Sequence, residues 1–235
     1  MILFLLFFTI LAIMGKHIYE LQQLNLNASV QQIQSPNSMV LQEKMRDKSP
    51  LIVHNLGNKY DIFQNISFEN LIQQNPGYII NDNNKMISLD IFSKADSQLS
   101  IYKNENIIRD FKLQESLKDI FQPFHSNITC NEKYYLSMYK GKNAITLTQN
   151  KKNGLVLFQI DCKSSLYLLD PKHKEDILQK ENNEIKKWAH KINLEPNLIV
   201  YVPPEWYYFY ECDESSIISS IDYDTYFTYP YNLLR

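Results

Sequence analysis

The sequence predicts a mainly β domain, a barrel or sandwich decorated by helices, behind an N-terminal membrane segment. Two observations predict the β domain: short strand-like segments with polar turns follow one another from residue 134 to 222, and few long helical patterns interrupt them. A third observation, the apolar run from Ile2 to Met14 broken only by Thr9, predicts the membrane segment. A chain of 235 residues can form one sizeable domain together with an anchor.

The N-terminal run is shorter than the ~20 residues that a membrane span typically needs. It also lacks the basic start and the small-residue cleavage site of a secretory signal. We expect residues 1–17 to form a retained anchor that contacts the membrane through residues 1–15, with a cleaved signal or a buried helix as alternatives. By the positive-inside rule, basic residues after the run place the domain on the cytoplasmic side of a single-pass anchor. They are Lys16, His17, Lys44, Arg46 and Lys48.

Residues 18–49 are rich in Gln and Asn, and we expect a helical continuation of the anchor followed by a polar connector. The folded domain is then expected to span residues 50–235. It opens at Pro50 with PLIVHNLG, an apolar strand that a Gly turn ends.

Short helices and strands alternate between residues 67 and 124. Ser67 is a suitable N-cap for a short helix, which the Asn75-Pro76-Gly77 cluster ends. YIIND and MISLDIF predict two strands around the polar turn from Asn81 to Lys85, and residues 111–124 have helical spacing again.

The C-terminal half has the spacing of strands. The expected strands cover residues 134–139, 144–148, 155–160, 165–169, 198–202, 206–212 and 216–222, and one helix is expected from Pro171 to about Lys191. Because alternate residues of a strand face opposite sides, Trp206, Tyr208 and Tyr210 should share one face. Tyr207 and Phe209 should share the other.

Composition narrows the classes of function. The formal net charge of -2 gives no reason to expect nucleic-acid binding. Cys130, Cys162 and Cys212 are too few for a disulfide framework and lack CxxC spacing, so we expect buried reduced thiols. With 5 Gly there is no P-loop, G-x-S-x-G or G-x-G-x-x-G motif. Plentiful Asn, Ile, Lys, Tyr and Phe indicate an AT-rich source genome, such as that of a large DNA virus or a protist.

Three segments carry a family resemblance. LEPNLIVYVPPEWYY at 194–208 resembles the pattern L-x-P-G-D-x-L-Y-[IV]-P-x-x-W-W-H of JmjC-like and cupin-like hydroxylases, with Asn197 at the usual Gly and Leu198 at the usual Asp. LVLFQIDCKSSLYLLDP at 155–171 is similar to that family's strand pair, and PLIVHNLG at 50–57 to its opening strand. The three segments occur in the family's order.

This resemblance implies a double-stranded β-helix, the cupin jelly-roll. In active members of the family, two His and one carboxylate hold Fe(II), and 2-oxoglutarate and dioxygen serve to hydroxylate or demethylate protein side chains. The resemblance assigns the three ligand positions to Gln149, Lys151 and Tyr208, and the cosubstrate anchor to Ser164. An amide is a weak ligand, an ammonium repels a dication, and a phenol stays protonated to a pH near 10.

We therefore expect a degenerate, catalytically inactive member of this superfamily, without bound Fe(II) or 2-oxoglutarate. It would act as a binding or structural module for a protein or peptide partner. The alternative is an Fe(II)/2-oxoglutarate-dependent protein hydroxylase or demethylase with atypical ligands. Ser164, Trp206 and Tyr210 are expected to line any pocket that stays open; otherwise Trp206, Tyr208 and Tyr210 fill the interior.

The remaining candidate ligands carry little signal. None of the 5 His stands in an H-x-D, H-x-E or HExxH motif, so we expect surface or structural roles for them. Asp222 and Asp224 form a D-x-D pair after the last strand, where a solvated turn is expected.

Overall fold

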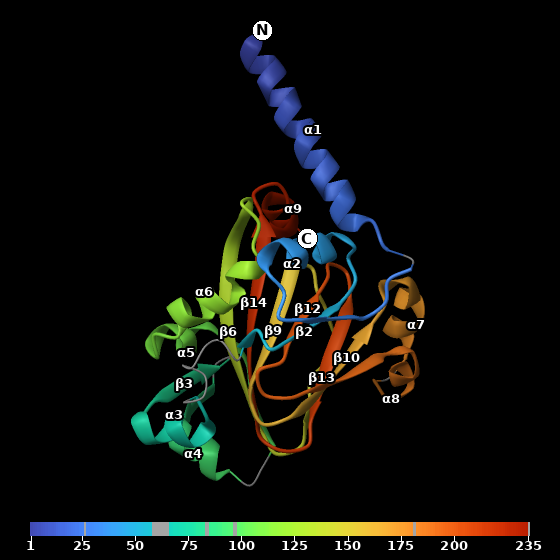
Figure 1. Cartoon of the computed structure of the whole chain (residues 1–235). Helices are drawn as coiled ribbons and strands as arrows, with labels where there is room; N and C mark the ends of the chain where they lie inside the picture. The colour runs from blue at the N-terminus through green and yellow to red at the C-terminus, as the bar shows by residue number, and fades with distance from the viewer. Residues whose placement is uncertain (26, 58–65, 83–84, 96–97, 181, 235) are drawn as a thin grey trace.

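The computed structural model describes residues 1–25, 27–57, 66–82, 85–95, 98–180 and 182–234 (Figure 1). It is a mixed α/β fold with a large, mostly antiparallel sheet and an apolar N-terminal helix. The helices are α1 Ile2–Gln22, α2 Ser38–Arg46, α3 Phe68–Gln74, α4 Leu89–Lys94, α5 Glu105–Asp110, α6 Gln114–Phe121, α7 Lys174–Gln179, α8 Asn182–Ile185 and α9 Tyr229–Leu233, with the 3-10 helices η3 Gln122–Phe124, η4 Pro171–His173 and η5 Lys186–Trp188.

The strands form two main sheets and a hairpin. They are β1 Gln31–Gln34, β2 Leu51–His54, β3 Ile79–Asp82, β4 Lys85–Ser88, β5 Leu99–Asn104, β6 Thr129–Lys140, β7 Asn143–Ala144, β8 Thr148–Gln149, β9 Gly154–Asp161, β10 Ser164–Leu169, β11 His190–Leu194, β12 Ile199–Val202, β13 Tyr207–Cys212 and β14 Ser216–Thr225. The seven-stranded sheet has the order β1-β2-β12-β9-β14-β6-β5, and the five-stranded sheet has β11-β10-β13-β7 with β8 also on β13. The β3–β4 hairpin stands apart.

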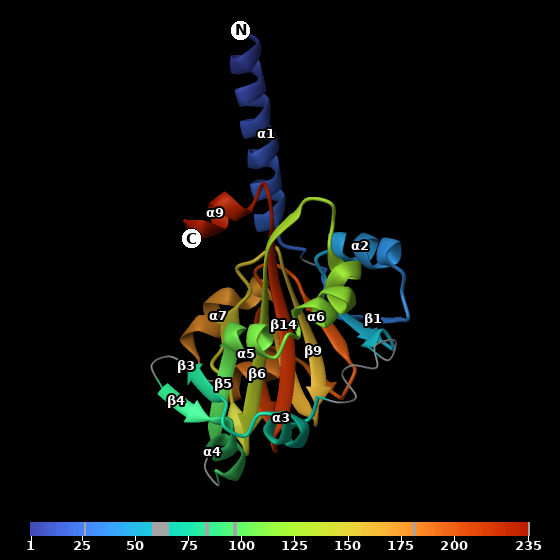
Figure 2. The same ribbon diagram turned by 90° about the vertical axis from the view of Figure 1, so that its left-hand side faces the viewer.

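The two sheets pack into layers that helices cover on both outer sides (Figure 2). Helices α2 to α6 bury their apolar side chains against one face of the seven-stranded sheet, where Phe158 of β9 and Ile221 of β14 lie. The opposite face of that sheet packs on the five-stranded sheet through residues such as Leu157 and Leu166. Helices α7 and α8 cover the outer face of the five-stranded sheet, against Phe209. One close approach requires glycine, because a Cβ at Gly154 would collide with the Tyr223 ring.

Helix α1 extends beyond the apolar run to Gln22 and projects from one end of the domain (Figure 1). It is long and apolar enough to cross a membrane, a property that signal sequences share. Its apolar stretch is not buried against the described part of the chain, which contradicts the buried-helix alternative. Its last turns contact the domain, since Leu21 is buried and the His17 ring stacks on Phe227 at 4.6 Å.

Most strands predicted from the sequence are confirmed, as is the helix at Ser67, whose hydroxyl accepts from the Asn70 amide at 3.2 Å. The expectation that residues 18–49 form a connector is incomplete: β1 pairs with β2, and Leu41 of α2 lies in the core. The second half of MISLDIF forms α4, because the Ser88 hydroxyl caps the Ile91 amide at 3.2 Å. Residues 83–84 of the predicted turn lie outside the described part of the chain.

The single helix expected over residues 171–191 is wrong. The segment forms η4, α7, α8 and η5, and Lys180 between α7 and α8 has an extended backbone. From His190 on, the chain forms β11, whose pairing with β10 satisfies the backbone groups on one edge of the strand. Helical periodicity in the sequence does not indicate that a segment can pair with the edge of a sheet instead of continuing as a helix.

Candidate functional site

Tyr208 lies between the two sheets. Its side chain, on β13, is 1% exposed, and its hydroxyl lies 3.3 Å from that of Tyr102 on β5. Burial raises the pKa of Tyr208 well above the ordinary value of a phenol, and the charge of Asp222 adds to the rise. Burial therefore favours the neutral phenol of Tyr208 over the phenolate.

Gln149 does not lie on the same side of the sheet as Tyr208. In the pairing of β8 with β13, Gln149 is opposite Tyr207, and Thr148 is opposite Tyr208. Directly opposed residues share a face, so Gln149 belongs to the outer face of the five-stranded sheet. Its amide donates to the Glu205 carboxylate at 2.9 Å.

Lys151 is exposed in the loop between β8 and β9. The neighbouring Lys152 turns inward instead, as its ion pair with Asp224 shows. The three positions that the resemblance assigns to metal ligands, Gln149, Lys151 and Tyr208, are thus not brought together.

Ser164, Trp206 and Tyr210 are buried in the packed protein. The Ser164 hydroxyl donates to Gln159 Oε1 at 2.8 Å, and the Gln159 amide donates in turn to the Ser216 hydroxyl at 2.8 Å. Trp206 and Tyr210 share the core between the sheets with Tyr208.

The predicted alternation along β13 is confirmed. Trp206, Tyr208 and Tyr210 belong to the core between the sheets, whereas Tyr207 and Phe209 belong to the core under α7 and α8. The Phe209 ring stacks on Tyr167 at 4.6 Å in that outer core. The large aromatic side chains of β13 thus pack on both sides of the five-stranded sheet.

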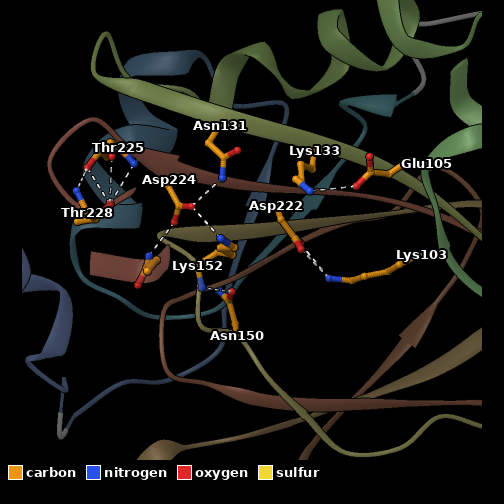
Figure 3. Close-up of polar contacts among 11 residues, drawn as sticks. Lys103, Glu105, Asn131, Lys133, Asn150, Lys152, Asp222, Asp224, Thr225 and Thr228 are labelled. Carbon is orange, nitrogen blue, oxygen red and sulfur yellow. Dashed lines mark hydrogen bonds and ion pairs between the residues drawn. The ribbon is translucent and has the colours of Figure 1, made fainter. Parts of the chain in front are cut away.

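Lys103 and Asp222 form an ion pair (Figure 3). It lies close enough to Tyr208 for the charge of Asp222 to help raise the pKa of the Tyr208 phenol. The Lys103 ammonium, from β5, donates to both carboxylate oxygens of Asp222 on β14, at 3.0 and 2.8 Å. The two side chains are only 20% and 13% exposed. The ammonium also lies 5.2 Å from the centre of the Tyr135 ring and 6.0 Å from that of Tyr102, within reach of cation–π attraction. A cation and its carboxylate, both supplied by the chain, therefore stand next to the interior tyrosines.

A second network surrounds Asp224, two residues further along β14 (Figure 3). Its carboxylate has no solvent exposure and accepts from Lys152 at 2.9 Å, Asn131 at 3.1 Å and Asn232 at 2.7 Å. Just beyond, the hydroxyls of Thr225 and Thr228 lie 2.9 Å apart and close the turn that ends the strand.

The expectation of a solvated turn at Asp222 and Asp224 is therefore wrong. Strand β14 runs on to Thr225, and both carboxylates are buried and paired. A signal was present in the sequence: Ile221 and Tyr223 continue the apolar alternation through the D-x-D pair. Sequence reasoning missed Lys103 and Lys152 altogether.

The histidines are dispersed over the fold. His17 is in α1, His54 in β2, His125 after η3, His173 in η4, and His190 in β11. Among the described residues, no three His, Cys, Asp or Glu side chains are grouped so that they could hold a metal ion.

The three cysteines are free, and only Cys212 is fully buried. Burial is the largest cause that raises the pKa of Cys212 to about 12 and that of Cys162 to about 11. Both side chains are therefore neutral thiols near pH 7, unsuited to nucleophilic catalysis.

A cavity of about 710 Å³ lies at the end of the domain where α1 emerges. Side chains of α1, of α2 and the segment after it, and of the end of β14 line it, among them Glu20, Arg46, Lys48 and Thr225. The residues expected to line a pocket, Ser164, Trp206 and Tyr210, do not border this cavity. This cavity thus lies at the base of α1.

A scan against protein-family models found no match, and a search of the curated proteins found no significant relative.

Proposed function

We propose that this chain is a membrane-anchored, catalytically inactive domain of the cupin/JmjC-like type that acts as a binding or structural module. Its fold would be the jelly-roll that the sequence resemblance implies. The observation that carries the proposal is the Lys103–Asp222 ion pair beside Tyr208.

The strand order supports a jelly-roll. Eight antiparallel stretches in chain order, β6, β7 with β8, β9, β10, β11, β12, β13 and β14, alternate between the two sheets, except that β10 and β11 both belong to the smaller one. Numbered one to eight, they are arranged one-eight-three-six in the larger sheet and two-seven-four-five in the smaller. A jelly-roll of two Greek keys would have this strand order, so the order supports the proposal.

The resembling segments support the same family. Residues 50–57 and 194–208 contribute β2 and β12, which pair, and residues 155–171 contribute β9, which pairs with β12. Asn197 stands where the family pattern has glycine, and its φ is +72°. That left-handed conformation is one that glycine adopts freely and asparagine tolerates.

The side chains next to Tyr208 do not fit Fe(II). A two-His-one-carboxylate site needs two neutral imidazoles and a free carboxylate at one point. Here the nearby carboxylate, Asp222, already holds the Lys103 ammonium with both oxygens. A dication would have to displace that ammonium and would gain only neutral phenols.

The membrane anchor is supported by α1 and by the charges that follow it. Lys16, Lys44, Arg46 and Lys48 come after the apolar run, which favours the cytoplasmic side for the domain. We infer that the module acts at the surface of the membrane that α1 enters.

The test of inactivity loads the full chain, purified in detergent, with Fe(II) under anaerobic conditions and measures its iron content. Dioxygen and 2-oxoglutarate are then added, and turnover is measured as succinate. The proposal expects far less than one iron per chain and no succinate formed from 2-oxoglutarate. Stoichiometric iron together with succinate would establish the alternative, a hydroxylase or demethylase with atypical ligands. If the parent chain does hold iron, Asp222→Asn tests whether Asp222 is a ligand, because the variant should then lose the iron.

A further inference from the structure

The end of the domain that carries α1 exposes large apolar side chains. They come from the segment after α1, from α2 and from the C-terminal segment around α9: Leu24, Met39, Val40, Tyr226, Leu233 and Leu234. Leu234 is 92% exposed and Tyr226 66%. These six residues define the membrane-proximal surface. Figures 1 and 2 show α2 and α9 on different sides of the base of α1, at the same end of the molecule.

Helix α9 is fixed in this position by polar contacts. The Gln22 amide at the end of α1 donates to the Tyr231 hydroxyl at 2.6 Å, and His17 stacks on Phe227. On the domain side, the Asn232 amide donates to the buried Asp224 carboxylate at 2.7 Å. The contacts on both sides hold the apolar residues of α9 at the level where α1 leaves the domain.

The length of the apolar part of α1 indicates where that level lies in a bilayer. Residues Ile2 to Met14 form helix for about 20 Å at 1.5 Å per residue. The hydrocarbon core of a bilayer is ~30 Å thick. Because His17 is docked on the domain, α1 cannot slide further out. The base of the helix must therefore be drawn close to the lipid, which brings the membrane-proximal surface to the interface.

The side chains of this surface match an interface chemically. Tyrosine is enriched at the interface between lipid and water, and transfer of an exposed leucine side chain from water to the acyl boundary is favourable. Lys44 and Arg46 in the last turn of α2 add positive charge, whereas Lys16 in α1 pairs with Glu20 at 3.7 Å. Basic residues at such a level attract anionic lipid headgroups.

We propose that the membrane-proximal surface docks onto the phospholipid bilayer that α1 enters, with α9 lying in the interface. This inference rests on the membrane anchoring in the proposed function. Docking would hold the domain against the lipid surface in one fixed orientation, whereas a flexible linker would let the domain rotate freely.

The experiment uses the full chain in vesicles of phosphatidylcholine and phosphatidylserine. A cysteine carrying an environment-sensitive fluorophore is introduced by Leu234→Cys or Met39→Cys, and by Ile91→Cys as the control. Ile91 is also an exposed apolar residue, in α4 at the opposite end of the molecule (Figure 1). The signal of the labelled parent chain is subtracted to remove the native cysteines.

We expect blue-shifted emission and several-fold weaker quenching by aqueous iodide at positions 234 and 39 than at position 91. If the chain floats with the vesicles but position 234 is quenched as strongly as position 91, the docking inference is overturned and the anchor stands. If the chain does not float with the vesicles, the anchoring fails and the docking inference fails with it.

Discussion

The two faces of the seven-stranded sheet carry different kinds of side chain. Toward helices α2 to α6 the strands present apolar side chains, such as Phe158 and Ile221. Toward the five-stranded sheet, the same strands present aliphatic residues near Leu157 and the ion-paired carboxylates Asp222 and Asp224. One face is held by close packing, and the other combines packing with buried charge.

The difference teaches how carboxylates buried between two sheets can be neutralised by lysines of the same chain. Buried carboxylates must be paired or they make folding costly. Here Lys103 and Lys152 supply the compensating charges, and both come from the chain itself. The following predictions separate what packing and charge contribute on the two faces.

The largest effect is expected on the helix-covered face. Phe158→Ala removes a fully buried ring from the middle of β9 and should lower the free energy of unfolding by about 4 kcal/mol. Guanidinium unfolding of the full chain in detergent, followed by circular dichroism, measures the loss. A loss below about 1 kcal/mol would mean that this face is loosely packed.

The next effect concerns the fully buried carboxylate. Asp224→Ala strands the Lys152 ammonium and two amide donors and should cost about 3 kcal/mol, at the low end for a broken buried pair because Lys152 is 28% exposed. The matched control is Asp90→Ala, which removes the surface pair with Lys94 and should cost less than about 0.5 kcal/mol. Equal losses in the two variants would contradict a structural role for the Asp224 network.

The Lys103–Asp222 pair should show strong coupling. Asp222→Leu alone leaves the half-buried ammonium of Lys103 without its carboxylate and should cost about 2 kcal/mol. Adding Lys103→Met removes that stranded charge, so the double variant should recover most of the loss. A double-mutant cycle measures this coupling. Additive losses would show that the two charges act independently.

The smallest effect is a pH dependence at the edge of the helix-covered face. Burial lowers the pKa of His125 below its ordinary 6.5, against the opposing pull of Glu132, and Lys118 lowers it further. The His125 side chain therefore binds a proton more readily in the unfolded chain than in the folded one. The free energy of unfolding is highest above about pH 6.5, where His125 is neutral in both states. It decreases as the pH falls from there through the pKa of His125 in the folded state. Unfolding measured from pH 7.5 to 5 should show this decline, and His125→Gln should make it shallower. An unchanged slope in the variant would assign the decline to other groups.

The sequence predicted the strands and helices better than it predicted which charged side chains are buried. Strands β9, β10, β12 and β13 follow from dense apolar and aromatic runs, which have few alternatives to a buried sheet. Strands β1 and β11, with the polar sequences QQIQ and HKINL, form only because a neighbouring strand offers hydrogen bonds. Such edge strands depend on tertiary pairing and leave little pattern in the sequence.

The buried charges were missed for a similar reason. Asp222 and Asp224 look like a solvated turn because their partners are remote: Lys103 lies 119 residues and Lys152 lies 72 residues earlier in the chain. A motif alignment also cannot predict the register in which β8 pairs with β13. The alignment therefore placed Gln149 and Tyr208 at one site, although their side chains face opposite sides of the sheet. A shift of one residue in a strand moves a side chain to the other face.

The most direct test asks whether Fe(II) and 2-oxoglutarate bind the folded chain. A ligand that binds only the native state at 100 times its dissociation constant adds about 2.7 kcal/mol, which raises the melting temperature by roughly 5–10 °C for a domain of this size. If the chain's own ion pair closes the interior beside Tyr208, Fe(II) and 2-oxoglutarate added together under anaerobic conditions leave the melting temperature unchanged. A rise that grows with the concentration of both, and that Asp222→Asn abolishes, would contradict the account.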